Sequence, residues 1–409
     1  MTPTITSITG KTILDSRGNP TLSITVEGSD GSSGTFSVPS GASTGAHEAH
    51  ELRDNNTPQG GVVRALSLLE EEIAPALVGK SLYAQSENDK ALIVLDATPD
   101  KGRLGANTLI GVSVALAKAA AASKGIEVWQ YLHDAFFEER KTGFPRLYAN
   151  LINGGRHAQT RLSFQEYHVV PKTTDMVEAS SIIARVQERM RENIIRQYGP
   201  VKRGDEGGFA LPVSDVEKPL TLLRNAVFEL GLQEQVDFAL DVAASSFFDA
   251  RKQEYAANDT SYNAQGLANL YKYLSEKYNL LSIEDPFSEE DFVSFASLPQ
   301  FIGDTLRVGD DLTTTNKERL LRAIQEKSID AIIIKPNQIG TLTETIETMK
   351  LAHTNGLKCI VSHRSGETVD SFIADLAYAS GAFGIKLGAR GPSEREAKYA
   401  RLMAIEKAR

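Results

Sequence analysis

The sequence contains only one cysteine and one tryptophan among its 409 residues. A single thiol excludes an intramolecular disulfide and suits a reducing compartment, so we expect a cytoplasmic protein. Cys359 stands inside the apolar run KCIVS. Free cysteines in such surroundings are usually buried and unreactive, so we expect no nucleophilic role for this one.

Long hydrophobic runs and an excess of positive charge are also missing. No run of 18 apolar residues occurs, and the N-terminal MTPTITSITG has neither the basic nor the apolar part of a signal peptide. We therefore expect no membrane insertion, and the Ala-rich segment 111–122 is predicted to be a packed helix. The formal net charge of −9 argues against a nucleic-acid partner. The composition, 41% hydrophobic and 24% charged, is that of an ordinary globular protein.

A chain of this length exceeds one small core, so two domains, or one barrel with additions, are expected. Residues 1–138 are predicted to form an α+β domain that begins with a hairpin, TLSITVEG and GTFSVPSG, around the turn 29–31. Helical periodicity follows at 62–77, 84–96 and 106–124, with a shorter helix near Val128. The polar run 137–145 marks the domain boundary. In residues 139–409 strand-like and helix-like runs alternate, which predicts a β/α barrel.

Ionisable residues follow six successive apolar runs in this second half. The runs and their residues are FALDVAASSF (Asp241), LSIEDPF (Glu284), VGDDL (Asp310), AIIIKPNQIG (Lys335), CIVSHRSGET (His363, Arg364) and GIKLGAR (Lys386). Parallel barrel strands end at one common face, where active sites lie. A lone acid after a strand commonly caps the next helix instead. Six units in succession, acids first and bases after, favour a site.

The residue types at these ends indicate a chemistry. Asp241, Glu284 and Asp310 are hard oxygen ligands of the kind that Mg²⁺ prefers. A nearby cation would depress the pKa of Lys335, which makes a lysine a general base. The run SHRSGET suits an oxyanion such as phosphate.

Three further segments are ambiguous by themselves. Glu206 in GDEGG belongs either to a surface turn or to a site, and a lone histidine such as His157 in NGGRHA is commonly structural. The run VPSGASTGAHE is either a linker or a mobile loop. If all three contribute, the parts describe one reaction: cations neutralise a carboxylate, a lysine removes the adjacent carbon-bound proton, and an acid assists departure of a β-hydroxyl.

Many motifs, in register from about residue 5 to 408, resemble the enolases, the phosphopyruvate hydratases of glycolysis. They include DSRGNPT (15–21), VPSGASTG (38–45), NGGRHA (153–158), GDEGG (204–208), SIEDPF (282–287) and SHRSGET (362–368). A lysine base with Mg²⁺ is the arrangement known for the enolase superfamily. The resemblance implies an eight-stranded β/α barrel with an irregular antiparallel start, preceded by a smaller α+β domain. It also implies Mg²⁺-dependent dehydration of 2-phospho-D-glycerate to phosphoenolpyruvate.

The resemblance further implies two Mg²⁺ ions per site when substrate is bound, and a role for each matching residue. The metal ligands would be Asp241, Glu284 and Asp310 for the first ion and Ser43 for the second. The catalytic residues would be Lys335 as base at C2, Glu206 with Glu166 as acid for the C3 hydroxyl, and His157 and His363. The substrate-binding residues would be Arg364 and Ser365 for phosphate, Lys386 for the carboxylate, and Gln165, Glu166 and His157.

Some positions depart from the family pattern. Leu387 stands where a threonine is usual, the following loop 388–392 is altered, with Pro392 where an arginine is usual, and Pro336 follows the base. These departures leave open a paralogue acting on a related phosphorylated or phosphonylated acid. A non-catalytic relative would lack a metal ligand or the base, and this chain has both. The family commonly forms homodimers pinned by ion pairs, and higher oligomers occur. Two of the pairing positions here are the uncharged Ser23 and Ala404, although a homo-oligomer is still expected.

Overall fold

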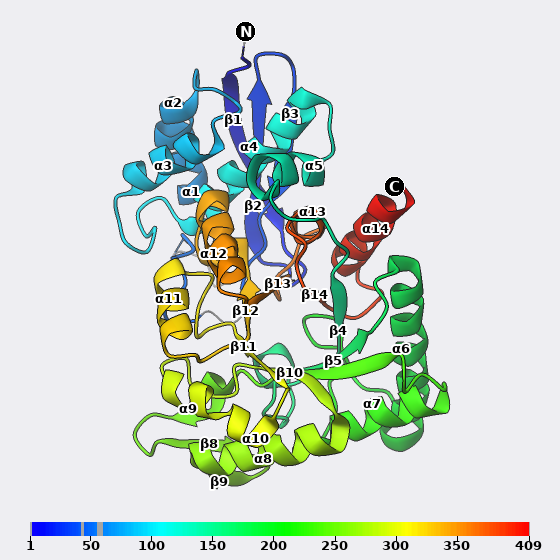
Figure 1. The fold of residues 1–409 in the computed structure, drawn as a ribbon. Coiled ribbons are helices and arrows are strands. Elements are labelled where there is room, and N and C mark those ends of the chain that lie inside the picture. Colours follow the sequence, from blue (N-terminus) through cyan, green and yellow to red (C-terminus); the bar gives the residue numbers. More distant parts are fainter. Residues whose placement is uncertain (1, 42–44, 55–59, 409) are drawn as a thin grey trace.

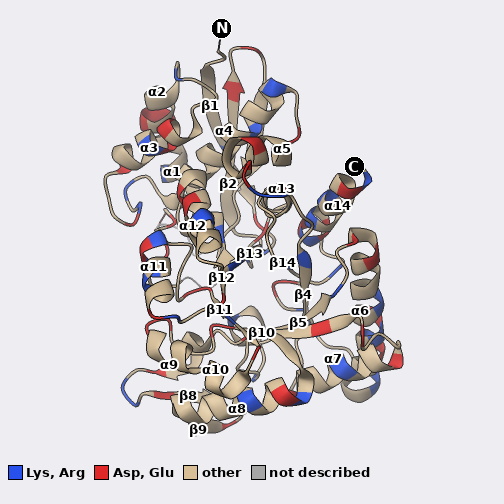
Figure 2. Cartoon of the chain, in the orientation of Figure 1, with Lys and Arg blue, Asp and Glu red and all other residues tan. Residues whose placement is uncertain are grey.

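The computed structural model describes residues 2–41, 45–54 and 60–408. In this structure a smaller α+β domain sits against one end of a closed eight-stranded barrel (Figure 1). This is the architecture that the resemblance implies. Figure 2 shows acidic and basic residues interspersed along the outer helices.

The N-terminal domain is built on a three-stranded antiparallel sheet. Its strands, in spatial order, are β1 (Ile5–Leu14), β2 (Pro20–Gly28) and β3 (Ser33–Ser37). Alternate residues of β2, including Leu22, Ile24 and Val26, are fully buried, as expected for a sheet with one covered face. The predicted hairpin is therefore confirmed. Strand β1 was not anticipated, because ITSITGKTIL mixes its apolar residues with serine, threonine, glycine and lysine.

The helices of this domain match the predicted periodicity to within one residue. They are α1 (Val63–Leu68), η1 (Leu69–Ile73), α2 (Ala74–Leu77), α3 (Gln85–Asp96), α4 (Ala106–Lys124), α5 (Val128–Leu132) and η2 (His133–Phe137). The first three are one continuous helical run, of which η1 is a π-helical turn. Pro75 follows this turn and lacks a backbone N–H, so the regular ladder is interrupted there.

Helix α4 forms the centre of the domain. In the described part of the chain it is the one helix long and apolar enough to cross a membrane, but 83% of its apolar stretch is buried inside the fold. It packs against β2 and β3. The prediction of a packed helix over residues 111–122 is confirmed, and its apolar character follows from this burial.

The barrel begins irregularly and then becomes regular. Its strands are β4 (Arg146–Asn153), β5 (Glu166–Pro171), β6 (Val236–Asp241), β10 (Leu280–Glu284), β11 (Leu306–Gly309), β12 (Ala331–Ile334), β13 (Lys358–Ser362) and β14 (Gly384–Leu387). Strand β5 is antiparallel to both of its neighbours, β4 and β6, whereas every other pair is parallel and β14 closes the barrel against β4. The predicted antiparallel start is confirmed.

Helices cover the outside of the barrel. They are α6 (Met176–Tyr198), α7 (Glu217–Glu229), α8 (Ala264–Tyr278), α9 (Phe292–Ser297), α10 (Pro299–Ile302), α11 (Lys317–Gln325), α12 (Leu342–Thr354), α13 (Phe372–Ala379) and α14 (Ser393–Lys407). Short 3-10 turns are η3 (Gly155–His157), η4 (Ala244–Phe247) and η5 (Pro336–Gln338). A small sheet of β7 (Phe248–Asp249), β8 (Glu254–Ala257) and β9 (Thr260–Tyr262) follows β6, and strands so short gave no pattern to predict.

The pleat of each strand decides which residues face the barrel interior. Tyr148, Ala331 and Ile333 belong to the apolar cluster that fills the interior. On β14 the neighbours Lys386 and Leu387 point to opposite sides, because side chains alternate along a strand. Lys386 reaches inner carboxylates, whereas Leu387 belongs to the outer core between strands and helices. Leu387 therefore lies outside the barrel interior.

Close packing of β3 on α4 yields a stability prediction. A Cβ atom at Gly34 would lie 2.2 Å from the backbone nitrogen of Ala119 and 2.3 Å from the carbonyl oxygen of Ala115. Gly34→Ala is therefore expected to lower the free energy of unfolding by about 1–3 kcal/mol, because the helix must move away. Chemical denaturation measures this. In the control Gly143→Ala the added Cβ atom would meet nothing closer than the Cα atom of Gly381 at 4.0 Å, and an equal loss in both variants would contradict the prediction.

Candidate active site

The predicted ionisable residues converge at one end of the barrel. Asp241 and Glu284 close β6 and β10, Asp310 and Lys335 follow β11 and β12, and Lys386 lies within β14. Because β5 runs in the opposite direction, its first residue, Glu166, reaches the same end. A cavity lies among these groups. Its lining consists of His157, Gln165, Glu166, Glu206, Lys335, Ser362, His363, Arg364, Ser365 and Lys386. Ser43 lies outside the described residues.

Lys386 links the carboxylates at the barrel axis. Its Nζ lies 2.8 Å from Asp241 Oδ2, 2.8 Å from Glu284 Oε1 and 3.2 Å from Glu166 Oε2. Burial lowers the pKa of Lys386, but these carboxylates outweigh it and hold the pKa well above its ordinary value. Burial and repulsion from Asp241 raise the pKa of Glu284 far above its usual range. Carboxyl groups are thus crowded in a place that water does not reach, and the loss of a proton from Glu284 is disfavoured there.

Asp310 is held from several sides. Its side chain pairs with Lys335 and accepts a hydrogen bond from Gln338 Nε2 at 3.0 Å. The carboxylate of Asp285 accepts hydrogen bonds from the backbone N–H groups of Asp310 (2.9 Å) and Asp311 (2.7 Å). The three aspartates bring carboxylate oxygens within 4.8 Å of one another, a grouping that could hold a metal ion.

Lys335 carries a raised pKa in this structure. Burial lowers the pKa of its ammonium group, but the adjacent charge of Asp310 outweighs burial. From the sequence we expected a pKa of Lys335 that is depressed by a neighbouring cation. A cation bound by Asp310 would reduce this attraction and lower the pKa of Lys335.

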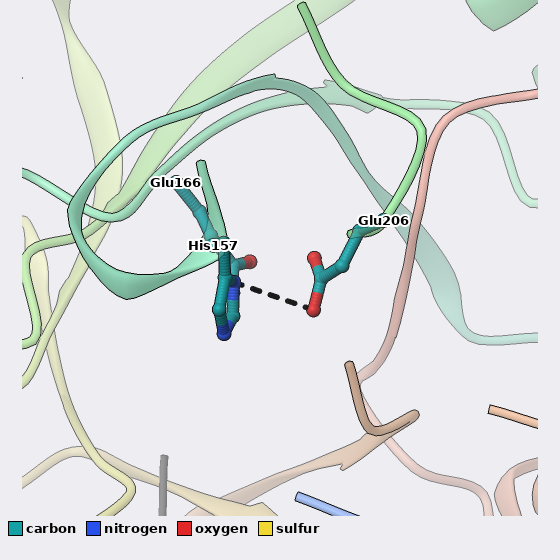
Figure 3. A group of neighbouring side chains, drawn as sticks. All are labelled: His157, Glu166 and Glu206. Atoms are coloured by element: carbon teal, nitrogen blue, oxygen red, sulfur yellow. Dashed lines mark ion pairs between the residues drawn. The ribbon is translucent and has the colours of Figure 1, made fainter. Parts of the chain in front are cut away.

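A second cluster faces the cavity from the side of β4 and β5. His157 Nδ1 lies 3.2 Å from Glu166 Oε1 and 3.5 Å from Glu206 Oε1 (Figure 3). The other carboxylate oxygen of Glu166, Oε2, lies 2.9 Å from His168 Nε2. Burial lowers the pKa of His157, but Glu206 and Glu166 raise it above its ordinary value. The protonation of each of these three side chains therefore depends on that of the other two.

Glu206 is fully enclosed, so the interpretation of GDEGG as a surface turn is wrong for this residue. Asn150 Nδ2 of β4 donates a hydrogen bond of 2.8 Å to its Oε2, and His363 Nε2 lies 3.3 Å from its Oε1. Burial and Glu166 raise the pKa of Glu206, but His363 and His157 outweigh them and lower it.

The SHRSGET loop joins the N-terminal domain at this site. Arg364 donates hydrogen bonds from Nη2 to both carboxylate oxygens of Glu48, at 3.1 and 3.0 Å, and from Nη1 to Asn337 Oδ1 at 2.9 Å. Ser40 and Gly366 exchange backbone hydrogen bonds of 2.7 and 2.9 Å. The described part of VPSGASTGAHE is therefore a wall of the site, and its interpretation as a simple linker is wrong.

The residues present fit a divalent cation. Asp241, Glu284 and Asp310 bring three buried carboxylates to adjacent strand ends. Gln165 Nε2 donates to Asp241 Oδ2 at 3.4 Å, while its buried Oε1 has no hydrogen-bond partner among the described residues. An oxygen donor set of this kind suits Mg²⁺ or a similar hard cation.

Some residues that shape the site were given no role by the sequence analysis. They are Glu48, Asn150, His168, Asp285 and Arg395. Glu48 stands in the quoted VPSGASTGAHE run, and Asp285 directly follows Glu284, so their neighbours carried a signal. Asn150 and His168 lie on strands β4 and β5, whose antiparallel pairing decides what they contact.

Family models match both domains. The description "Enolase, N-terminal domain" covers residues 5–132, and "Enolase, C-terminal TIM barrel domain" covers residues 141–408. The second match alone spans more than half of the chain.

Curated relatives match over nearly the full length. The chain is 44% identical to an enolase of Methanopyrus kandleri, over 99% of this chain and 96% of the relative. It is 42% identical to an enolase of Methanococcus aeolicus, over 98% and 95%. It is 43% identical to an enolase of Mycobacteroides abscessus, over 99% and 94%. With a matching barrel, a matching N-terminal domain and full-length relatives, this chain belongs to the enolase family.

Proposed function

We infer that this chain is a hydro-lyase that removes water from 2-phospho-D-glycerate to give phosphoenolpyruvate. Membership of the enolase family supports this reaction. The observation that carries the inference is a lysine on one wall of the cavity and a carboxylate pair on the opposite wall. Strands β12 and β5 are four positions apart around the eight-stranded barrel, so Lys335 faces Glu166 and its neighbour Glu206 across the site.

Lys335 is the proposed base. As a neutral amine its Nζ accepts the proton from C2 of the substrate, and the electron pair of the broken C–H bond passes into the carboxylate group. Mg²⁺ held by Asp241, Glu284 and Asp310, with a second ion reached by Ser43, would neutralise this developing charge and favour the neutral amine. Two such ions would supply the positive charge that the substrate carboxylate needs as it gains negative charge.

Glu206 is the proposed acid. It transfers a proton to the C3 hydroxyl as the C–O bond breaks, so the products are water and a C2=C3 double bond. The proton comes from the cluster that Glu206 shares with His157 and Glu166. Because acid and base lie on opposite walls, proton and hydroxyl leave from opposite faces of the substrate.

The remaining cavity residues hold the two anionic ends of the substrate. Arg364 and Ser365 bind the phosphate, and the guanidinium supplies bidentate hydrogen bonds. Lys386 faces the carboxylate, Gln165 adds a polar contact, and His363 closes the wall beside Glu206. Burial of these groups excludes water, which strengthens each electrostatic interaction.

The paralogue hypothesis was motivated by Leu387 and by the altered loop 388–392. The outward orientation of Leu387 removes the first of these two reasons. The base and the metal-ligand set are present, which also disfavours a non-catalytic relative. We further propose a cytoplasmic homodimer or higher homo-oligomer. Ser23 is buried and Ala404 is exposed in the single chain, so an interface would need contacts other than ion pairs at these two positions.

A direct assay tests the proposed function. The purified protein with Mg²⁺ is expected to convert 2-phosphoglycerate to phosphoenolpyruvate, followed by the ultraviolet absorbance of the product. Mixing with excess chelator should abolish turnover, and added Mg²⁺ should restore it. Absence of turnover with a folded protein and Mg²⁺ would reject the inference.

Two substitutions separate the two halves of the reaction. Lys335→Ala is expected to abolish exchange of the C2 proton with solvent deuterium, because it removes the amine that is proposed to accept this proton. Glu206→Gln should keep this exchange while dehydration falls by at least about 100-fold, the usual size of a general-acid contribution. Proton NMR of the substrate follows exchange, and Lys350→Ala on the surface is the control. Normal exchange in Lys335→Ala would exclude Lys335 as the base.

Metal binding can be tested without turnover. Asp241→Asn removes one buried charge from the proposed ligand set while preserving an oxygen donor. We expect the Kd for Mg²⁺, measured by calorimetry, to rise at least about tenfold, since loss of even an outer partner commonly costs 10–100-fold. Asp249→Asn on the exposed strand β7 is the matched control. An unchanged Kd in Asp241→Asn would remove this residue from the metal site.

A further inference from the structure

One cation near the site has no role in the reaction described above. Arg395 lies on α14 and is completely buried, with an exposed fraction of 0%. Its nearest carboxylate is that of the adjacent Glu394, 3.8 Å from Nε, and this Nε has no hydrogen-bond partner among the described residues. Burying a charge without close pairing carries a large desolvation cost. A compensating function is therefore expected.

The guanidinium group of Arg395 instead joins two loops of the active site. Nη1 donates to the carbonyl oxygen of Arg364 at 2.6 Å, and Nη2 donates to that of Ser365 at 2.8 Å. Nη2 also lies 3.2 Å from the carbonyl oxygen of Asp205, the residue before the proposed acid. One planar side chain thus connects the proposed phosphate-binding loop with the loop of Glu206.

The same group also decides the state of a histidine. Arg395 Nη1 lies 2.8 Å from His363 Nδ1. An arginine has no acceptor and stays protonated, so Nδ1 must accept this hydrogen bond. The proton of a neutral His363 is therefore on Nε2, which lies 3.3 Å from Glu206 Oε1. Burial and the charge of Arg395 lower the pKa of His363 against the opposing effect of Glu206, which keeps the ring neutral.

The backbone leaves room for this contact at one glycine. A Cβ atom at Gly388 would lie 2.3 Å from the carbonyl oxygen of Glu206 and 3.0 Å from Arg395 Cδ. The next residue, Ala389, donates its N–H to that same Glu206 oxygen at 2.9 Å. No space is therefore left between the end of β14, the loop that carries Glu206 (the acid loop) and Arg395 on α14. A shift of Arg395 would consequently move Glu206.

We propose that Arg395 is a positioning residue that holds His363 in its Nε2–H tautomer and fixes the acid loop against the phosphate-binding loop. The proposal rests on the proposed function for its kinetic consequences, but the tautomer itself does not depend on any substrate. Arg395 contacts neither substrate nor reacting atoms, and it acts through His363 and through the carbonyl groups of residues 205, 364 and 365.

The test is the ¹⁵N NMR spectrum of histidine side chains in the full-length, unsubstituted protein. His363 is assigned among the seven histidines by the loss of its signals in His363→Asn. We expect a protonated Nε2 and an unprotonated, hydrogen-bonded Nδ1 throughout the neutral pH range. A proton on Nδ1, or an imidazolium ion at neutral pH, would overturn the proposal whether or not any variant folds.

A variant tests the consequence for catalysis. Arg395→Lys keeps the charge but cannot reach both loops and His363 together. We expect the His363 signals to move and kcat for 2-phosphoglycerate to fall by about 10–100-fold, in the range known for outer partners of catalytic groups. Tyr399→Phe on the same helix removes a buried hydrogen bond to Gly388 without touching His363, so its His363 signals should stay in place. Unmoved signals and near-normal kcat in folded Arg395→Lys would contradict the proposal.

Absence of turnover in the unsubstituted protein would instead reject the proposed function. The tautomer of His363 would still be tested by the NMR measurement, because that measurement needs no substrate.

Discussion

The structure depends on one electrostatic constraint, which is the neutralisation of carboxylates that are buried at the end of a barrel. Asp241, Glu284 and Glu166 meet at the single ammonium group of Lys386. Each buried ion costs several kcal/mol of desolvation unless it is paired, so the set persists only with cations among it. Lys335, directly after β12, and Lys386, on β14, supply part of that charge. A carboxylate set with more negative than positive charge is also a site that attracts a divalent ion, and structural balance and catalysis therefore use the same groups.

The barrel delivers these groups because of its pleat and its strand directions. On parallel strands the last inward residue reaches the catalytic end, which accounts for the acids of β6 and β10. Glu166 reaches the same end only because β5 is antiparallel and begins there. The antiparallel strand β5 thus places Glu166, which neighbours the proposed acid Glu206, opposite the proposed base Lys335. The strands β5 and β12 are four positions apart around the barrel. An all-parallel barrel would present the last residue of β5, Pro171, at this end instead.

Much of this could be predicted from sequence, and the limits have physical causes. Strand-end residues such as Glu284 and Lys335 follow apolar runs, so local pattern and a common barrel face sufficed to bring them together. The helix 106–124 was predictable to the residue because its apolar surface is continuous. Residues such as Asn150 and Arg395 carry no local pattern, since they act through contacts with segments 56 and 32 residues away in sequence. The orientation of Leu387 likewise depends on the register of β14, which sequence alone leaves open.

The SHRSGET loop is where the distant parts of the chain meet. Glu48 from the N-terminal domain holds the guanidinium of Arg364, and Arg395 from the last helix holds the carbonyl group of the same residue. Helix α14 lies beside α6 on the outside of the barrel (Figure 1), so this second contact is anchored in the barrel wall. The two supports approach Arg364 from different domains. Substitutions in Glu48 and Arg395 should therefore not act additively on substrate binding, since each changes the geometry that the other stabilises. In this protein the proposed phosphate site is a junction of both domains, which gives a physical reason why the small domain and the barrel belong to one chain.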